Sequence, residues 1–295
     1  MRVSVIVPNY NHAKYLRQRI DSILNQTCQN FELIILDDCS TDNSRIIIDE
    51  YVTRFPEIKS YYNSSNSGSA FKQWDYGVNK ANGEFIWIAE SDDYAEPGFL
   101  EKSLAILTGN ENIGFVYCNS KIIDELNKTE SYVSDLRITL DKNKWSKDYS
   151  NKGLNEISEY LYLNNTINNV SGVLFRKKKY VDAGYADHSM KYCGDWFLYI
   201  RILLISDIAY FSSPLNIFRF HANSSIREYF RKSSYFLEVL RVYLFVSSKI
   251  RLVPKKRLAM GRILLGIIYR KLSHGSIPEF NKVFKILIDH KRQNK

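Results

Sequence analysis

Short apolar runs alternate with stretches of helical periodicity through the first 90 residues, and this alternation most constrains what the chain can fold into. The runs cover residues 3–7, 33–36 and 85–89, and a further strand is expected at 58–62. Between them, apolar residues recur at helical spacing, as at Leu16, Ile20 and Ile23. Continuous apolar runs of this length indicate strands that are buried on both faces. Strand–helix alternation therefore predicts a parallel sheet whose strands are joined by right-handed crossovers.

Aspartate pairs follow two of the predicted strands. Asp37 and Asp38 follow the run at 33–36, and Asp92 and Asp93 follow the run at 85–89. Ligands of such sheets bind outside the carboxyl ends of the strands, so we expect both pairs to face one crevice. Carboxylates gathered in this way repel one another unless a cation joins them, and oxygen ligands suit Mg²⁺ or Mn²⁺. This arrangement fits a substrate that carries a metal-bound diphosphate.

Helix capping is the competing interpretation of the aspartates, because Asp is favoured at helix N-termini. We assign Asp42 to capping. For Asp92 and Asp93 both interpretations stay open, since Pro97 marks the start of a helix nearby.

The second half of the chain has a weaker pattern. Residues 119–155 are polar and charged, which predicts a surface excursion. A helix is expected near 154–163, a strand at 172–176, and a further helix that opens at Gly194 and Asp195. Two strand-like runs follow at 208–211 and 216–220, and His221 comes directly after the second.

Charge divides the chain into a mildly acidic body and a basic tail. From residue 227 onward there are 17 Lys and Arg against four Asp and Glu, whereas residues 1–226 carry 24 basic and 28 acidic side chains. Apolar residues at helical spacing over 260–268 and 280–288 predict amphipathic helices in the tail. Such a tail can bind an anionic membrane surface, for which Lys255, Lys256 and Arg257 are suited, or it can pack on the body as an ordinary helical subdomain. No nucleic-acid-binding motif accompanies it, so nucleic acid is not an expected partner.

Targeting and redox signals are weak. The four cysteines form no CxxC motif, which argues against a structural zinc site and a disulfide framework. The opening apolar run ends at Pro8, too early for a signal peptide, and no stretch approaches the about 20 apolar residues of a membrane helix. We therefore expect a cytoplasmic protein, with peripheral contact at the inner face of the membrane through the tail.

Several motifs resemble family 2 glycosyltransferases, which have the GT-A fold. The matching segments are 3–11, 22–27, 31–40, 66–68, 81–86 and 90–93, in the family's order and spacing. The resemblance is dense through about residue 118 and sparser from 170 to 221. It implies a mostly parallel, Rossmann-like sheet flanked by helices, with a C-terminal helical tail. We expect the GT-A domain to cover residues 1–225, with a nucleotide-sugar-binding half (1–118) and an acceptor-facing half (119–225), and the tail to cover 226–295.

The resemblance also implies roles for individual residues. Asp38 corresponds to the aspartate that holds the base, Asp92 to a carboxylate that reaches the ribose, and Asp93 to a metal ligand. The nucleotide-sugar site would further include Pro8, Asn9, Tyr10, Asn66 and Gly68.

On the acceptor side, Asp195 occupies the position of the catalytic base, at the N-terminus of a helix. Helix capping is the competing interpretation of Asp195, and the two roles are compatible. Many relatives carry Glu-Asp there, where this chain has Gly194 and Asp195. A histidine at the position of His221 completes the metal shell or contacts the diphosphate in some relatives, and a purely structural role is the alternative. His12 and His188 have weaker claims, and Trp196 suits sugar stacking or core packing equally.

The resemblance therefore implies inverting transfer of a sugar from a nucleoside-diphosphate sugar, with a UDP-sugar as the expected donor and Mn²⁺ or Mg²⁺ as the cofactor. The acceptor would be a glycan or lipid-linked glycan in bacterial surface polysaccharide synthesis. A catalytically degenerate nucleotide-binding subunit of an assembly complex is the alternative. A dehydrogenase is disfavoured, because the turn at 8–11 lacks the glycines of the dinucleotide fingerprint.

Overall fold

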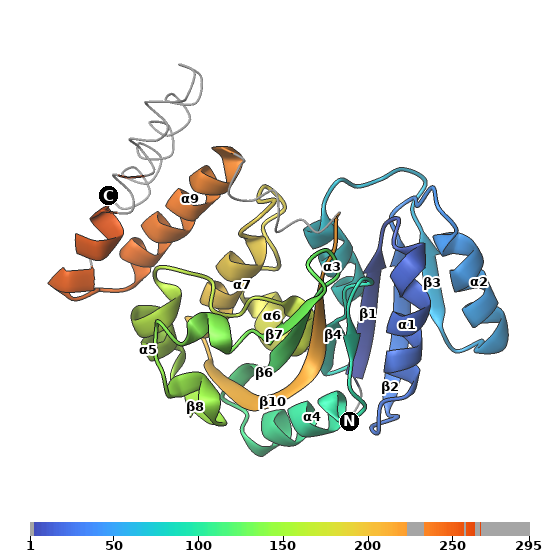
Figure 1. Cartoon of the computed structure of the whole chain (residues 1–295), viewed down its shortest axis with the longest axis horizontal. Helices are drawn as coiled ribbons and strands as arrows, with labels where there is room; N and C mark the ends of the chain where they lie inside the picture. The colour runs from blue at the N-terminus through green and yellow to red at the C-terminus, as the bar shows by residue number, and fades with distance from the viewer. Residues whose placement is uncertain (1–2, 223–232, 257, 263–265, 267–295) are drawn as a thin grey trace.

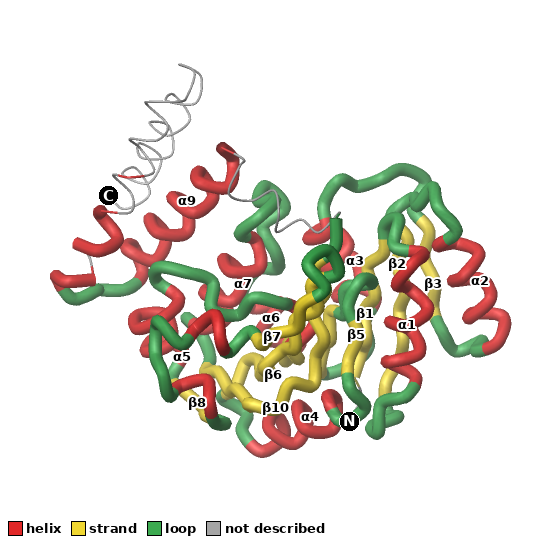
Figure 2. The backbone as a smooth tube through the Cα atoms, in the orientation of Figure 1, coloured by secondary structure: helices red, strands yellow, loops and turns green. Residues whose placement is uncertain are grey.

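The computed structural model describes residues 3–222, 233–256, 258–262 and 266, which form a central sheet with helices on both faces (Figures 1 and 2). The strands are β1 (Val3–Asn9), β2 (Phe31–Asp37), β3 (Lys59–Tyr62), β4 (Phe85–Ile88), β5 (Tyr94–Ala95), β6 (Ile113–Asp124), β7 (Thr129–Tyr132), β8 (Tyr149–Asn151), β9 (Val173–Arg176) and β10 (Asp207–Phe220). The helices are α1 (Ala13–Leu24), α2 (Ser44–Arg54), α3 (Ala70–Lys80), α4 (Phe99–Gly109), α5 (Gly153–Glu156), α6 (Lys177–Asp182), α7 (Gly194–Leu203) and α9 (Ser233–Lys249). Short turns of 3-10 helix, η1 (Asp135–Arg137), η2 (Lys144–Ser146) and η4 (Val170–Gly172), and a π-helical segment, η3 (Ile157–Leu161), complete the described elements.

The first half has the predicted parallel arrangement. Strands β3, β2, β1 and β4 lie side by side in that order, and each pair is parallel. Every residue of β1 is buried. Val3, Val5 and Val7 face a cluster formed with α1, α2 and α4, whereas Ile6 faces the opposite cluster with α3. The continuous apolar run thus reflects a strand covered on both faces.

Close packing of α3 on β1 depends on a glycine. A Cβ atom at Gly77 would lie 2.4 Å from Cγ2 of Ile6, so only glycine lets the helix approach this strand. The loop that precedes α3 is thereby held near the carboxyl ends of β1 and β2, where the predicted nucleotide residues lie.

The second half is mixed, so the expectation of a mostly parallel sheet holds only in part. Strand β9 runs antiparallel to both β4 and β6, while β6 and β10 are parallel. The two runs expected at 208–211 and 216–220 belong to the single strand β10, whose register shifts between Phe211 and Asn216. The helix expected near 154–163 is divided between α5 and the π-helical η3.

The surface excursion expected at 119–155 is confirmed in part: most of these residues are exposed or half-buried, but the segment is ordered and anchored to the core. This segment contains β7 and β8, and the side chains of Trp145 and Arg137 are each only 3% exposed. Trp145 donates a hydrogen bond to the hydroxyl of Tyr117 (2.9 Å) and lies within the main hydrophobic cluster. The sequence pattern did not predict this order, because the segment is mostly polar and the few large apolar residues that anchor it are widely spaced.

The described part of the tail packs on the domain. Leu240, Val242 and Val246 of α9 are fully buried, and α9 lies beside α7 in Figure 1. A boundary at residue 225 therefore does not separate α9 from the core. Lys256 pairs with Glu159 of the body, whereas Arg257 and the helix expected at 280–288 lie outside the described residues. None of the described helices combines the length and the apolar character needed to cross a membrane.

Candidate active site

A pocket of about 340 Å³ opens at the carboxyl ends of β1 and β2. Its lining includes Pro8, Asn9, Tyr10, Asp38, Asn66 and Gly68, which are six of the seven residues expected to bind the nucleotide sugar. They come from three segments that are far apart in the sequence, and the parallel pairing of β1 with β2 brings them to one edge of the sheet.

Asp38 is 4% exposed and anchors the loop that borders this pocket. Its Oδ1 accepts hydrogen bonds from Nδ2 of Asn63 (2.6 Å), the amide of Ser67 (2.9 Å) and Nε2 of Gln73 (3.0 Å). Its Oδ2 accepts a bond from the Ser67 hydroxyl (2.7 Å). Asp38 therefore shapes the pocket wall through the loop as well as lining the pocket itself.

The same loop turns at Gly68, whose φ of +70° is a conformation that favours glycine. Asn66 closes the turn from both sides: its Oδ1 accepts a bond from the Gly68 amide (2.7 Å), and its Nδ2 donates to the backbone oxygen of Asp38 (3.0 Å). Asp42 stabilises the neighbouring helix starts, as expected, by accepting bonds from the amides of Ala13 and Ser44 (2.9 Å each).

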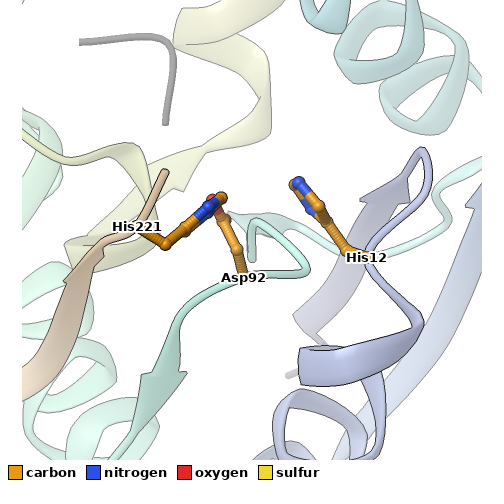
Figure 3. A group of neighbouring side chains, drawn as sticks. All are labelled: His12, Asp92 and His221. Carbon is orange, nitrogen blue, oxygen red and sulfur yellow. The ribbon is translucent and has the colours of Figure 1, made fainter. Parts of the chain in front are cut away.

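His12, Asp92 and His221 form a candidate metal centre beside the pocket. Figure 3 shows His12 reaching from the β1–α1 connection, Asp92 from the turn after β4, and His221 from the end of β10. One ligand atom from each residue lies within 4.8 Å of the others. Nε2 of His221 is 3.0 Å from Oδ2 of Asp92, and Nδ1 of His12 is 2.8 Å from the Ser91 hydroxyl.

The electrostatics of this cluster suit a cation. Burial lowers the pKa of His12, against the charge of Asp92, which raises it. Burial opposes ionisation of Asp92, but the hydrogen bond from His221 and the charges of both histidines bring its pKa below the usual value. An ionised carboxylate beside a neutral imidazole is the protonation state in which both can bind a divalent ion.

Asp93 does not belong to this cluster. It is 2% exposed, its Oδ2 accepts bonds from Asn169 (2.8 Å) and Ser171 (2.7 Å), and its Oδ1 accepts a bond from the Arg219 amide (3.0 Å). Burial, with the nearby charge of Asp92, raises the pKa of Asp93 to about 6. The metal role expected for Asp93 finds no support in this geometry, because its carboxylate is occupied in joining the β4 turn to η4 and β10.

A larger pocket of about 550 Å³ adjoins the first, and Glu90 lines both. Glu90 accepts a bond from the Trp74 indole (2.6 Å), and burial raises its pKa to about 8. The large pocket also contains Asp92 and Asp195. An amide- and hydroxyl-rich segment contributes Asn164, Asn165, Thr166, Asn168 and Asn169.

Asp195 lies in the first turn of α7, as expected. The N-cap residue is Cys193, so the capping interpretation of Asp195 is not supported. Oδ2 of Asp195 accepts a bond from Nδ2 of Asn165 (2.9 Å) and Oδ1 accepts one from the Trp196 amide (2.7 Å). Burial outweighs these bonds and raises the pKa of Asp195 to about 7, a value suited to a base near neutral pH.

The glycine before Asp195 has a steric cause. A Cβ atom at Gly194 would lie 2.4 Å from Cε2 of Phe71, which lines the large pocket. The Phe71 ring thus fills the space that a side chain at position 194 would need, and this chain departs there from the Glu-Asp pair of many relatives.

Sequence reasoning underrated His12. The signal was available, since His12 follows β1 directly and β1 pairs in parallel with β4, which leads to Asp92. His188 lies elsewhere, with Nε2 2.6 Å from Oδ2 of Asp75. Trp196 is 3% exposed, and its indole donates a hydrogen bond to the backbone oxygen of Leu161 (2.9 Å). Most of its side chain is therefore packed in the core.

The fold is that of GT-A glycosyltransferases. A crystal structure of S. aureus TarS 1–349 in complex with UDP-GlcNAc superposes with a TM-score of 0.69 at 21% identity, covering 98% of this chain and 80% of that one. The mannosyltransferase PcManGT from Pyrobaculum calidifontis, in complex with GDP-Man and Mn²⁺, gives a TM-score of 0.61 at 14% identity, covering 99% of this chain and 82% of that one. The sequence model of glycosyl transferase family 2 matches residues 4–180, and the chain belongs to this family.

Curated relatives are glycosyltransferases as well. An uncharacterized glycosyltransferase of Rickettsia typhi is 30% identical over 70% of this chain and 60% of its own length. The putative teichuronic acid biosynthesis glycosyltransferase TuaG of Bacillus subtilis is 36% identical over 36% of this chain and 41% of its own. The matched segments thus span less than two thirds of these relatives.

Proposed function

We propose that the chain transfers a sugar from a nucleoside-diphosphate sugar to an acceptor hydroxyl, with inversion at the anomeric carbon. The observation that carries the proposal is the order of three features along one crevice. The small pocket suits the nucleoside, the cluster of His12, Asp92 and His221 adjoins it, and the large pocket with Asp195 continues beyond. Glu90 lines both pockets, so they share a wall where the diphosphate and the sugar would lie.

In this proposal Asp195 takes the proton of the acceptor hydroxyl. The acceptor oxygen forms a bond to the anomeric carbon from the large pocket, while the bond from that carbon to the diphosphate oxygen breaks on the opposite side. His12, Asp92 and His221 would hold a divalent ion beside the diphosphate, where it would supply positive charge to stabilise the leaving group. Since attack and departure occur on opposite faces of the sugar, the configuration inverts.

The donor set favours Mn²⁺ over Mg²⁺. Two imidazoles and one carboxylate are available at the cluster, and imidazole is a poor ligand for Mg²⁺, which prefers an all-oxygen shell. We assign the metal to His12, Asp92 and His221, in place of the Asp93 and His221 expected from the sequence. Asp92 then binds the metal instead of the ribose.

A UDP-sugar is the proposed donor, with support from the TarS structure that contains UDP-GlcNAc. The teichuronic acid biosynthesis in the name of TuaG supports a role in bacterial surface polysaccharide synthesis. We propose a glycan or lipid-linked glycan as the acceptor and transfer at the cytoplasmic face of the membrane. The alternative of a degenerate nucleotide-binding subunit has no favouring observation, because Asp195 keeps both its helix position and its pocket.

The test is binding of nucleoside diphosphates and nucleotide sugars, with and without Mn²⁺, followed by thermal shift, and then release of UDP in the presence of acceptor glycans. Metal-dependent stabilisation by one nucleotide and metal-dependent turnover are expected. Nucleotide binding without turnover in any acceptor fraction would favour the degenerate subunit.

A further inference from the structure

One carboxylate joins α9 to the segment that leads into α7. Oε1 of Glu238 accepts a hydrogen bond from the amide of Lys191, and its Oε2 accepts bonds from the amides of Tyr192 and Cys193, all at 2.8 Å. Glu238 is 6% exposed. Charge-assisted bonds of this kind are short and strong, and three consecutive backbone amides are fixed by them immediately before the helix begins.

Two further residues of α9 bind segments on either side of Asp195. Arg241 pairs with Asp187 (2.9 Å) and donates to the Ser189 hydroxyl (2.9 Å), at the other end of the segment that Glu238 binds. Tyr243 donates to the backbone oxygen of Leu163 (2.7 Å), two residues before Asn165. Asn165 is the side chain that binds Oδ2 of Asp195.

We infer that Glu238 is a positioning residue for Asp195, so that α9 completes the catalytic site. This inference rests on the base role proposed for Asp195. Glu238 fixes the backbone from 191 to 193, which sets where α7 starts and therefore where the carboxylate of Asp195 lies in the large pocket.

Electrostatics adds a second effect of the same residue. The negative charge of Glu238 raises the pKa of Asp195, as a smaller contribution behind burial. Cys193 and Tyr199 from its own helix region and Tyr235 from α9 also interact electrostatically with Asp195. Further charged or titratable groups line the same pocket, namely Glu90, Asp92, Arg137, Lys191 and Arg219. Cys193, Tyr199 and Tyr235 are neutral near pH 7, whereas Glu238 contributes a negative charge whose removal should lower the pKa of Asp195.

The test compares E238Q and E238D with the wild type in UDP release from a UDP-sugar with Mn²⁺ and acceptor. For E238Q we expect unchanged UDP binding and a kcat lower by about 10–100-fold. The fall of the rate at acidic pH, which we call the acidic limb of the pH–rate profile, should move to lower pH. E238D keeps the charge but shortens the reach, so its kcat should fall without displacement of the limb. Glu159→Gln, which removes only the pairing of an exposed side chain with Lys256, is the matched control and should behave as wild type.

A kcat and pH profile of E238Q equal to wild type, with Asp195→Asn inactive, would overturn the inference. If E238Q does not fold, E238D decides, since full activity in that variant contradicts positioning. Absence of turnover in the wild type would instead count against the proposed function. In that case, ¹³C NMR can follow the titration of the Asp195 carboxyl in wild type and E238Q. Identical titration curves would reject the positioning role of Glu238.

Discussion

Nε2 of His221 lies 3.0 Å from Oδ2 of Asp92, although the two residues are 129 positions apart in the sequence. Asp92 is brought to this point by the turn after β4 and His221 by the end of β10, and His12 completes the cluster from the β1–α1 connection. Adjacent Asp93 points into the protein and binds other groups.

Substitution of the two adjacent aspartates should therefore have different consequences. Asp92→Asn should fold normally and lose Mn²⁺-dependent stabilisation by UDP, which for a ligand at 100 times its Kd amounts to about 2.7 kcal/mol. Asp93→Asn should lower the free energy of unfolding by about 1–3 kcal/mol, because an amide NH₂ would face the donors of Asn169, Ser171 or Arg219. Thermal melts with and without UDP and Mn²⁺ separate the two effects. Equal loss of metal dependence in a stable Asp93→Asn protein would contradict our assignment.

The pH dependence of transfer should follow Asp195. A base with a pKa of about 7 is active when deprotonated, so the rate should be constant above pH 7 and fall about tenfold per pH unit well below it. Initial rates between pH 5 and 9 measure this, and Asp195→Asn should abolish the limb together with most of the activity. An acidic limb near pH 4 would place the base elsewhere.

Stability should depend on the same group. The pKa of Asp195 is raised from 3.8 to about 7 in the folded protein, so between these values the folded state binds more protons than the unfolded state. Stability from this group is therefore fully present below about pH 4 and is lost as the pH rises to 7. Asp195→Asn should be more stable than wild type at pH 8, by about 1–3 kcal/mol, and similar near pH 4. Urea unfolding at both pH values tests the sign.

Asp38→Asn should weaken nucleotide binding through the loop it anchors. The new NH₂ group would replace one of the two oxygens that accept bonds from Asn63, Ser67 and Gln73, at a cost of about 1–3 kcal/mol in stability. We expect UDP stabilisation to fall in thermal melts. Asp148→Asn is the matched control, because Asp148 accepts bonds from Ser212 and lines neither pocket, so UDP binding should be unchanged.

Gly194→Ala should move the Phe71 ring into the large pocket, since the new Cβ would lie 2.4 Å from Cε2. Overpacking of this kind lowers stability by about 1–3 kcal/mol. Phe71→Leu should relieve it, so a double-mutant cycle should give a coupling energy of about 0.5–3 kcal/mol. Gly109→Ala, where nothing lies within 4 Å of the added Cβ, is the control. Additive effects of the 194 and 71 substitutions would refute the steric explanation.

Local patterns determined a large part of the architecture. The buried runs at 3–7 and 33–36 required strands covered on both faces, and the crossover rule placed their carboxyl ends at one edge. Six of the expected nucleotide residues accordingly line one pocket. Asp195 was expected in the first turn of a helix and lies there.

Tertiary structure decided which side chains enter the site, because their partners come from later parts of the chain. Neighbouring side chains in a turn point in different directions, and which of Asp92 and Asp93 faces the crevice depends on the Asn169, Ser171 and Arg219 partners that arrive 76 to 126 residues later. Burial of Trp145 and docking of α9 through Glu238 likewise arise from pairings between distant segments. Periodicity reports only the environment along one element, so the sequence by itself determined the strands and the edge where the site forms, and long-range packing selected the side chains that meet there.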